Sequence, residues 1–122
     1  MLKELADGPF FYYSRNERAR TMKEQIIRLL EESTTQCLAE GLFEVKSLPF
    51  IELEVTRDES HGDYASNVAM VIASQARKNP RAVAQAIVSK LKDDGELLSR
   101  VEIAGPGFIN FFVREERWRG QL

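Results

Sequence analysis

Residues 100–113 read RVEIAGPGFINFFV, and this stretch decides the fold of the chain. Apolar runs on both sides of residues 104–107 predict two short strands joined by a tight turn, in which proline fixes φ and glycine permits unusual backbone angles. Side chains of a strand alternate between its two faces. One face of the second strand is apolar and is predicted to form core: Ile109, Phe111 and Val113. The other face carries two rings and an amide: Phe108, Asn110 and Phe112.

The second face has two explanations. A flat ring beside an amide is the pairing that reads an unstacked nucleic-acid base, because the ring stacks on the base while the amide bonds its edge. Alternatively, the strand is buried on both faces and Asn110 bonds a neighbouring turn, since such period-2 patterns recur in many half-buried sheets. The strand alone leaves both explanations open.

Upstream, residues 22–40 follow helical spacing. Apolar side chains recur on one side: Met22, Ile26, Leu30, Cys37 and Leu38. Thr21 and Glu24 form a Thr-x-x-Glu capping box, which predicts the start of the helix, and Gly41 is a plausible stop. We expect an amphipathic helix of about 18 residues that packs on the sheet.

Residues 50–56 alternate between apolar and acidic side chains. The apolar set is Ile51, Leu53 and Val55, and the acidic set is Glu52 and Glu54. This pattern predicts a half-buried strand. Its acidic face would repel phosphate, so RNA is not expected to approach from that side.

Two further helices are predicted between this strand and the hairpin. Asp63 or Ser66 is the expected cap of the first helix, and Asn79 with Pro80 starts the second, which Gly95 ends. Small alanine-rich faces should let these helices pack as an antiparallel pair on one face of the sheet. The predicted fold class is therefore α+β, a small antiparallel β-sheet with α-helices packed on one face.

The composition fits one small domain without a metal site. The chain has 122 residues, 43% hydrophobic and 30% charged, which suffices for one core but not two. It has no apolar run of the ~20 residues needed to cross a bilayer. The single cysteine, Cys37, excludes an internal disulfide and fits a reducing compartment. With one His and one Cys, a closed zinc site is not expected.

Charge is distributed unevenly along the chain. Residues 1–76 hold 8 Lys/Arg and 13 Asp/Glu, whereas residues 77–122 hold 9 and 6, so a net charge of −5 is followed by one of +3. The basic surplus accompanies the hairpin. Because phosphate attraction scales with the number of contacts, a surplus this small predicts auxiliary binding of RNA and no strong clamp.

Three blocks carry a resemblance to a known family. HGDYASNVAM (61–70), KNPRAVAQAIV (78–88) and VEIAGPGFINFFV (101–113) together resemble the N-terminal appended domain of arginyl-tRNA synthetase. The similarity covers roughly residues 22–122. It divides the chain into an unmatched extension or leader (1–21), the appended domain (22–113) and the start of a linker helix toward a catalytic domain absent from this sequence (114–122).

The resemblance implies a role in tRNA recognition. In this family the appended domain contacts the D-loop corner of tRNA, so the implied partners are tRNA and the catalytic domain of the same chain. Phe108 would stack on a splayed base and Asn110 would bond its edge. Gly105 and Gly107 would form the turn that presents them. Generic phosphate contacts are expected from Lys78 and Arg81. Cytoplasmic localisation is implied as well.

No catalytic residues are expected in this chain. The signature motifs of the synthetase active site are absent, so ATP and Mg²⁺ are implied for the parent enzyme only. His61 near Asp63 is better explained as a polar turn than as an acid–base pair, because no nucleophile accompanies it. An alternative function is a protein–protein module that uses Phe108 and Phe112 as an apolar patch. The two functions differ in their expected salt dependence. RNA binding should weaken steeply as the salt concentration rises, whereas binding through an apolar protein interface should be nearly unaffected.

Overall fold

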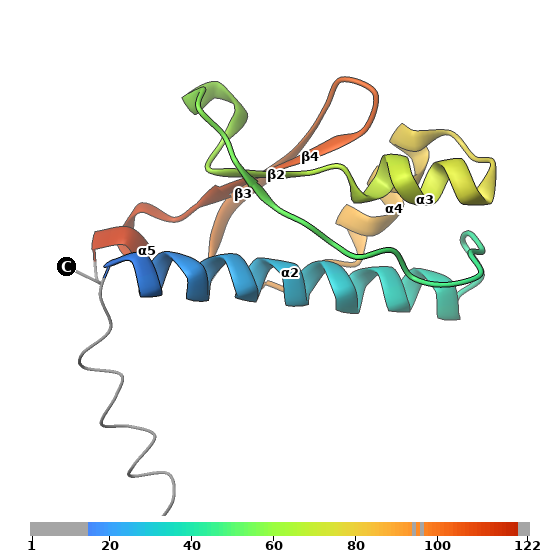
Figure 1. Ribbon diagram of the computed structural model, residues 1–122, viewed down its shortest axis with the longest axis horizontal. Coiled ribbons are helices and arrows are strands. Elements are labelled where there is room, and N and C mark those ends of the chain that lie inside the picture. Colours follow the sequence, from blue (N-terminus) through green and yellow to red (C-terminus); the bar gives the residue numbers. More distant parts are fainter. Residues whose placement is uncertain (1–14, 94, 96, 120–122) are drawn as a thin grey trace, which may run out of the picture.

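The fold is an antiparallel sheet lined on one side by helices, as the computed structural model shows for residues 15–93, 95 and 97–119 (Figure 1). The order of strands in the sheet is β1-β2-β4-β3, and every neighbouring pair is antiparallel. The strands are β1 (Glu54–Val55), β2 (Tyr64–Ser66), β3 (Leu98–Ala104) and β4 (Phe108–Val113). The expected α+β class and the hairpin of β3 and β4 are confirmed. Residues 1–14 of the expected extension lie outside the described residues.

The helices cover the sheet from one side (Figure 1). They are α2 (Arg15–Ala39), α3 (Val68–Ala76), α4 (Pro80–Ser89) and the short α5 (Glu115–Arg119), with a 3₁₀ turn η1 (Glu59–His61). The long α2 runs beneath the sheet, and α4 contacts both α2 and the strands β3 and β4. The expected pair is present, because α3 and α4 pack against each other.

The start of α2 differs from the prediction, whereas its end agrees. The chain is already helical at Arg15, so Thr21 lies inside the helix and the expected capping box at Thr21 and Glu24 is wrong. A capping box satisfies N–H groups that are free only at a helix start, and here the preceding turn supplies partners. Gly41 does end the helix: it has φ 74°, and its N–H donates to Leu38 O at 3.1 Å.

The strand expected at residues 50–56 is mostly irregular. Only Glu54 and Val55 pair with β2, because β2 itself is three residues long. Ile51 is buried as predicted, but Val55 is 69% exposed. Since β1 lies at the sheet edge, no neighbouring strand covers Val55. The alternating pattern therefore identified core positions and overstated the length of the strand.

The caps of α3 and α4 follow the sequence in part. Asn79 accepts from the N–H of Arg81 at 2.8 Å, and Pro80 is the first residue of α4, as predicted. Ser66 Oγ accepts from Val68 N at 3.1 Å and so bonds the first turn of α3, but the N-cap itself is Asn67, whose side chain makes no cap bond.

Two predicted roles near these helices are wrong. Asp63 does not cap α3, because its carboxylate accepts from the Val113 N–H of β4 at 2.8 Å. The second helix ends at Ser89, well before Gly95. Lys90 N–H bonds back to Ile87 O in a tightened last turn, after which the chain leaves the helix.

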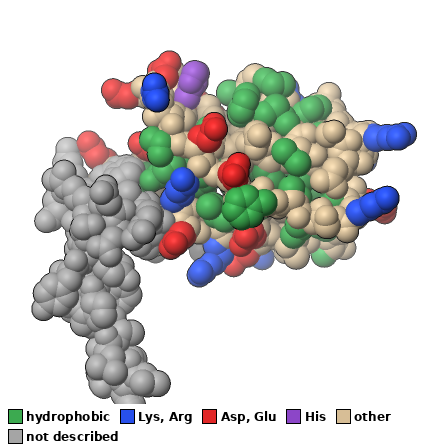
Figure 2. All heavy atoms as spheres, viewed as in Figure 1, with side chains coloured by type: hydrophobic (Ala, Val, Ile, Leu, Met, Phe, Trp, Pro, Cys, Tyr) green, Lys and Arg blue, Asp and Glu red, His purple; other side chains and the backbone are tan. Residues whose placement is uncertain are grey.

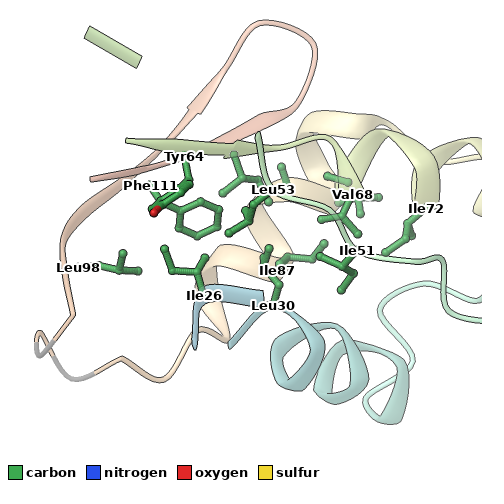
Figure 3. Packing of buried hydrophobic residues seen from close by; sticks show 14 of the residues in the cluster. Ile26, Leu30, Ile51, Leu53, Tyr64, Val68, Ile72, Ile87, Leu98 and Phe111 are labelled. Atoms are coloured by element: carbon green, nitrogen blue, oxygen red, sulfur yellow. The ribbon is translucent and has the colours of Figure 1, made fainter. Parts of the chain in front are cut away.

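The core lies between the sheet and α2, as Figure 3 shows. Ile109 and Phe111 have no exposed surface, and the Phe111 ring points from β4 toward Ile26 of α2. The face predicted to form core is therefore confirmed. Cys37 is buried among these helices, and this burial raises the pKa of its thiol, which is typical of an inert cysteine.

Truncation of the core ring should destabilise the fold far more than truncation of the outward ring. Phe111→Ala removes a fully buried ring and should lower the free energy of unfolding by about 3–5 kcal/mol. Phe108→Ala, at 39% exposure, should cost about 1 kcal/mol or less. Urea melts of both variants measure this difference. Equal losses would show that both faces of β4 are packed alike.

Candidate nucleic-acid interface

The sheet has a second surface, which we call the outer face, on the side away from α2. The strand register places these residues on it: Ala65, Arg100, Glu102, Phe108, Asn110 and Phe112. η1 and the β3–β4 turn both rise on this side of the sheet (Figure 1). The outer face therefore lies between two raised segments, and β4 runs through its middle.

Asn110 is less accessible than predicted. Its register partners are Ala65 on β2 and Glu102 on β3, and these neighbours leave it only 4% exposed. In the part of the chain that the structure describes, its amide makes no side-chain hydrogen bond, so the expected alternative of a bond to a neighbouring turn is not realised. No amide atom of Asn110 is both fully buried and unpaired, so the amide keeps contact with solvent and has unused hydrogen-bonding capacity.

Phe112 is not free on the outer face. The guanidinium of Arg100 lies over its ring, 4.0 Å from the ring centre, and Arg100 Nε pairs with Glu102 at 2.9 Å. Arg100 was not among the predicted site residues. The signal for it was its spacing, because Arg100 precedes Glu102 by two residues and therefore shares its face.

The segment 61–63 has a structural role. A Cβ on Gly62 would lie 2.6 Å from Phe111 O, so only glycine permits the close approach of this segment to β4. Asp63 N–H donates to the same carbonyl at 2.8 Å, and its carboxylate bonds Val113 N. These contacts anchor η1 beside β4.

The β3–β4 turn packs on the start of α4, and we call this contact the hairpin corner. Gly107 has φ 144°, and a Cβ on it would lie 3.1 Å from Pro80. Arg81 Nη1 donates to Gly105 O at 2.6 Å. The structure thus brings four predicted site residues together: Gly105, Gly107, Phe108 and Arg81. Arg81, a predicted phosphate contact, uses one guanidinium nitrogen to bond the turn.

Exposed basic side chains adjoin the hairpin corner. Arg77 and Lys78 are exposed and stand just before Asn79 and Pro80. The stretch from Tyr64 to Lys92 contains five Lys or Arg and no Asp or Glu. The net charges of residues 1–76 and 77–122 do not reveal this basic stretch, because it spans the boundary between them. Figure 2 shows Lys and Arg side chains projecting from the end of the molecule where α3 and α4 lie.

The opposite end of the outer face is acidic. Asp58 accepts from Ser60 Oγ and Ser60 N, and these hydrogen bonds hold the pKa of its carboxyl below the ordinary value. Glu59 stands in the same segment and the exposed Arg57 precedes it, and Figure 2 shows Asp and Glu side chains on this side together with a Lys or Arg and the His side chain. An anion therefore meets attraction at the hairpin corner and repulsion at η1.

Within residues 15–93, 95 and 97–119, no three His, Cys, Asp or Glu side chains cluster as metal ligands. No helix in that part of the chain is long and apolar enough to span a membrane.

Substitution of the two turn glycines should separate close packing from backbone strain. Gly107→Ala should cost about 2–3 kcal/mol of unfolding free energy, because it combines a sparsely populated φ with contact against Pro80. Gly105→Ala is the control, with φ 56° and an ordinary 3.8 Å contact to Phe108, and should cost about 1 kcal/mol. Urea unfolding of both variants tests this, and equal losses would contradict tight packing on Pro80.

Comparisons with known proteins agree with the resemblance seen in the sequence. The family described as the arginyl tRNA synthetase N terminal domain matches residues 21–113. Arginine–tRNA ligase of Citrifermentans bemidjiense is 45% identical over 101 residues, which cover 83% of this chain and 18% of that protein. The same enzyme of Listeria welshimeri is 50% identical over 93 residues, covering 75% and 16%.

A solved structure shares the fold. Arginyl-tRNA synthetase from Plasmodium falciparum matches 81% of this chain with a TM-score of 0.67 and 13% identity, over 17% of its own length. At this identity the match supports the fold alone. This chain spans less than a fifth of the length of these curated relatives. By sequence, it belongs to the family of arginyl-tRNA synthetase N-terminal domains.

Proposed function

We propose that this chain is the tRNA-recognition domain of an arginine–tRNA ligase and contacts the D-loop corner of tRNA. Its partners are then the tRNA and a catalytic domain in the same polypeptide. The curated relatives support this proposal, because they carry the name arginine–tRNA ligase and are several times longer than the matched segment. A reduced, buried Cys37 and a role in protein synthesis both fit the cytoplasm.

One observation carries the proposal. Phe108 offers a ring at the surface of the outer face, and Asn110, two residues along the same strand, has an amide without a hydrogen-bond partner among the described residues. A base that stacks on the ring can bring its edge toward the amide. Stacking contributes about 1–3 kcal/mol per base, and hydrogen bonds to the base edge add sequence preference.

Electrostatics favour one direction of approach. Arg77 and Lys78 adjoin the hairpin corner, whereas Asp58 and Glu59 flank the other end of the outer face. The phosphate backbone should therefore lie along the α3–α4 end, with the base inserted toward β4. Few phosphate contacts fit there, so binding by this chain alone should be weak and salt-sensitive.

A protein-binding role on the same strand is less favoured by the geometry. Such a role needs a contiguous apolar patch at its centre. Arg100 lies over Phe112, so Phe108 alone remains as an exposed ring on this face. A charged group in the middle of the patch suits stacking on a base better than an apolar interface.

In this proposal the catalytic domain carries out the activation of arginine and its transfer to tRNA. We expect ATP and Mg²⁺ to bind in the catalytic domain, and this chain should support aminoacylation through tRNA placement alone. Purified chain should therefore give no arginine-dependent ATP–pyrophosphate exchange. A signal above the buffer control would contradict this assignment.

Loss of the ring or the amide should weaken tRNA use. In a full-length ligase carrying this domain, Phe108→Ala or Asn110→Ala should raise the KM for tRNA about 5- to 150-fold, since ~1.4 kcal/mol is tenfold. Arginine activation should stay unchanged, because it takes place in another domain. Phe50→Ala is the matched control: Phe50 is 87% exposed but lies beside Glu52, away from the outer face, and its loss should leave KM unaltered.

A second arm tests whether these side chains meet one base. Replacement of the splayed D-loop base should weaken the wild type and add little to the loss in Phe108→Ala, because contacts within one interaction are not additive. Melting curves of Asn110→Ala are needed beside the kinetics, since Asn110 is buried. Fully additive losses would show that the base and the ring do not touch.

A further inference from the structure

Arg77 stands in a conformation that its side chain disfavours. It has φ 57° and ψ 48°, the left-handed region, and it is the one residue other than glycine with positive φ in the described part of the chain. In this region the Cβ of an L-residue crowds the backbone, which is why glycine or asparagine usually occupies it. The fold requires this backbone shape, because Arg77 ends α3 and its N–H bonds Ala73 O.

Nothing inside the domain explains an arginine at this position. The Arg77 side chain is exposed, and among the described residues it has no hydrogen bond or ion pair. Glycine would give the same turn without crowding. The hydrogen bonds that end α3 account for the left-handed backbone but not for an arginine in it, and disfavoured backbone states cluster at functional sites.

The position of Arg77 indicates which ligand. It precedes Asn79 and Pro80, and Pro80 touches the turn that carries Phe108. No Asp or Glu occurs between Tyr64 and Lys92, so no acid on α3 or α4 neutralises it. The neighbouring cation Arg81 is already bonded to Gly105 O, and the start of α4 is occupied by the Asn79 side chain.

We propose that Arg77 binds a backbone phosphate of the RNA whose base lies on Phe108. This inference rests on the proposed tRNA role and adds a residue to it. The planar guanidinium can hold two oxygens of one phosphate, which suits a single fixed contact beside the base. Arg81 instead positions the turn, and Lys78 adds unspecific charge.

The decisive variant is Arg77→Gly, because it moves stability and binding in opposite directions. Without the Cβ the left-handed turn relaxes, so the melting temperature should rise by about 2–5 °C. The affinity of this chain for tRNA in low salt should fall about 3- to 10-fold, and the slope of log K against log salt should shrink by about 0.7–0.9, the value for one lost phosphate contact. A misfolded variant cannot produce this combination.

Two controls accompany it. Arg28→Gln removes one exposed charge on α2, away from the hairpin corner, and should change neither the slope nor the melting temperature appreciably. Phe108→Ala should weaken tRNA binding without changing the slope, because stacking releases no counterions.

The outcomes separate this inference from the function on which it rests. Binding that weakens in Phe108→Ala but not in Arg77→Gly overturns the phosphate contact and leaves tRNA recognition standing. Binding that depends on Arg77 but not on Phe108 supports the anion contact and overturns base recognition. A lower melting temperature in Arg77→Gly overturns the premise of strain, and tRNA binding that neither Phe108→Ala nor Arg77→Gly weakens overturns both proposals.

Discussion

The two-sided burial of β4 is the constraint on which the rest of the structure depends. As an inner strand, β4 is hydrogen-bonded to β2 and β3, and its Ile109 and Phe111 side chains have no exposed surface. Because side chains alternate along a strand, the burial of Ile109 and Phe111 forces Phe108 and Asn110 to point to the outer face. A shift of one residue in register would bury the ring and expose the core, so the packing energy of the core also orients the outer face.

The hairpin and the helix pair could be predicted from the sequence because their signals are local. Alternation, a Gly-Pro-Gly turn and the Asn79-Pro80 start act within a few residues. The failures are non-local. Residues 50–56 alternate, but the length of a strand depends on its partner, and β2 offers three residues. The Thr21 capping box is sound local chemistry that the continuing helix from Arg15 overrides.

The candidate site divides in the same way. The face shared by Phe108 and Asn110 follows from spacing, whereas the burial of Asn110 depends on Ala65 and Glu102, which neighbouring strands contribute. The hydrogen bond from Arg81 to Gly105 joins residues 24 positions apart. No local sequence pattern predicts such a contact, so in the sequence Arg81 resembles any other surface cation. The left-handed state of Arg77 is invisible in sequence, because only a glycine or asparagine there would have signalled it.

Weak binding by this domain is compatible with a decisive role in an enzyme. A domain joined to a catalytic domain meets the same tRNA at an effective concentration set by the linker, commonly in the millimolar range, so a contact that is negligible in isolation raises overall affinity strongly. Under that arrangement a dense basic surface is a disadvantage, because it holds every RNA alike. In the proposed role, one stacking ring, one amide and a few cations at the hairpin corner would favour a tRNA that presents a splayed base at the right distance from the catalytic domain. The net charge of −5 over residues 1–76 would add to this selectivity, since it would repel RNA that lacks this compensating contact.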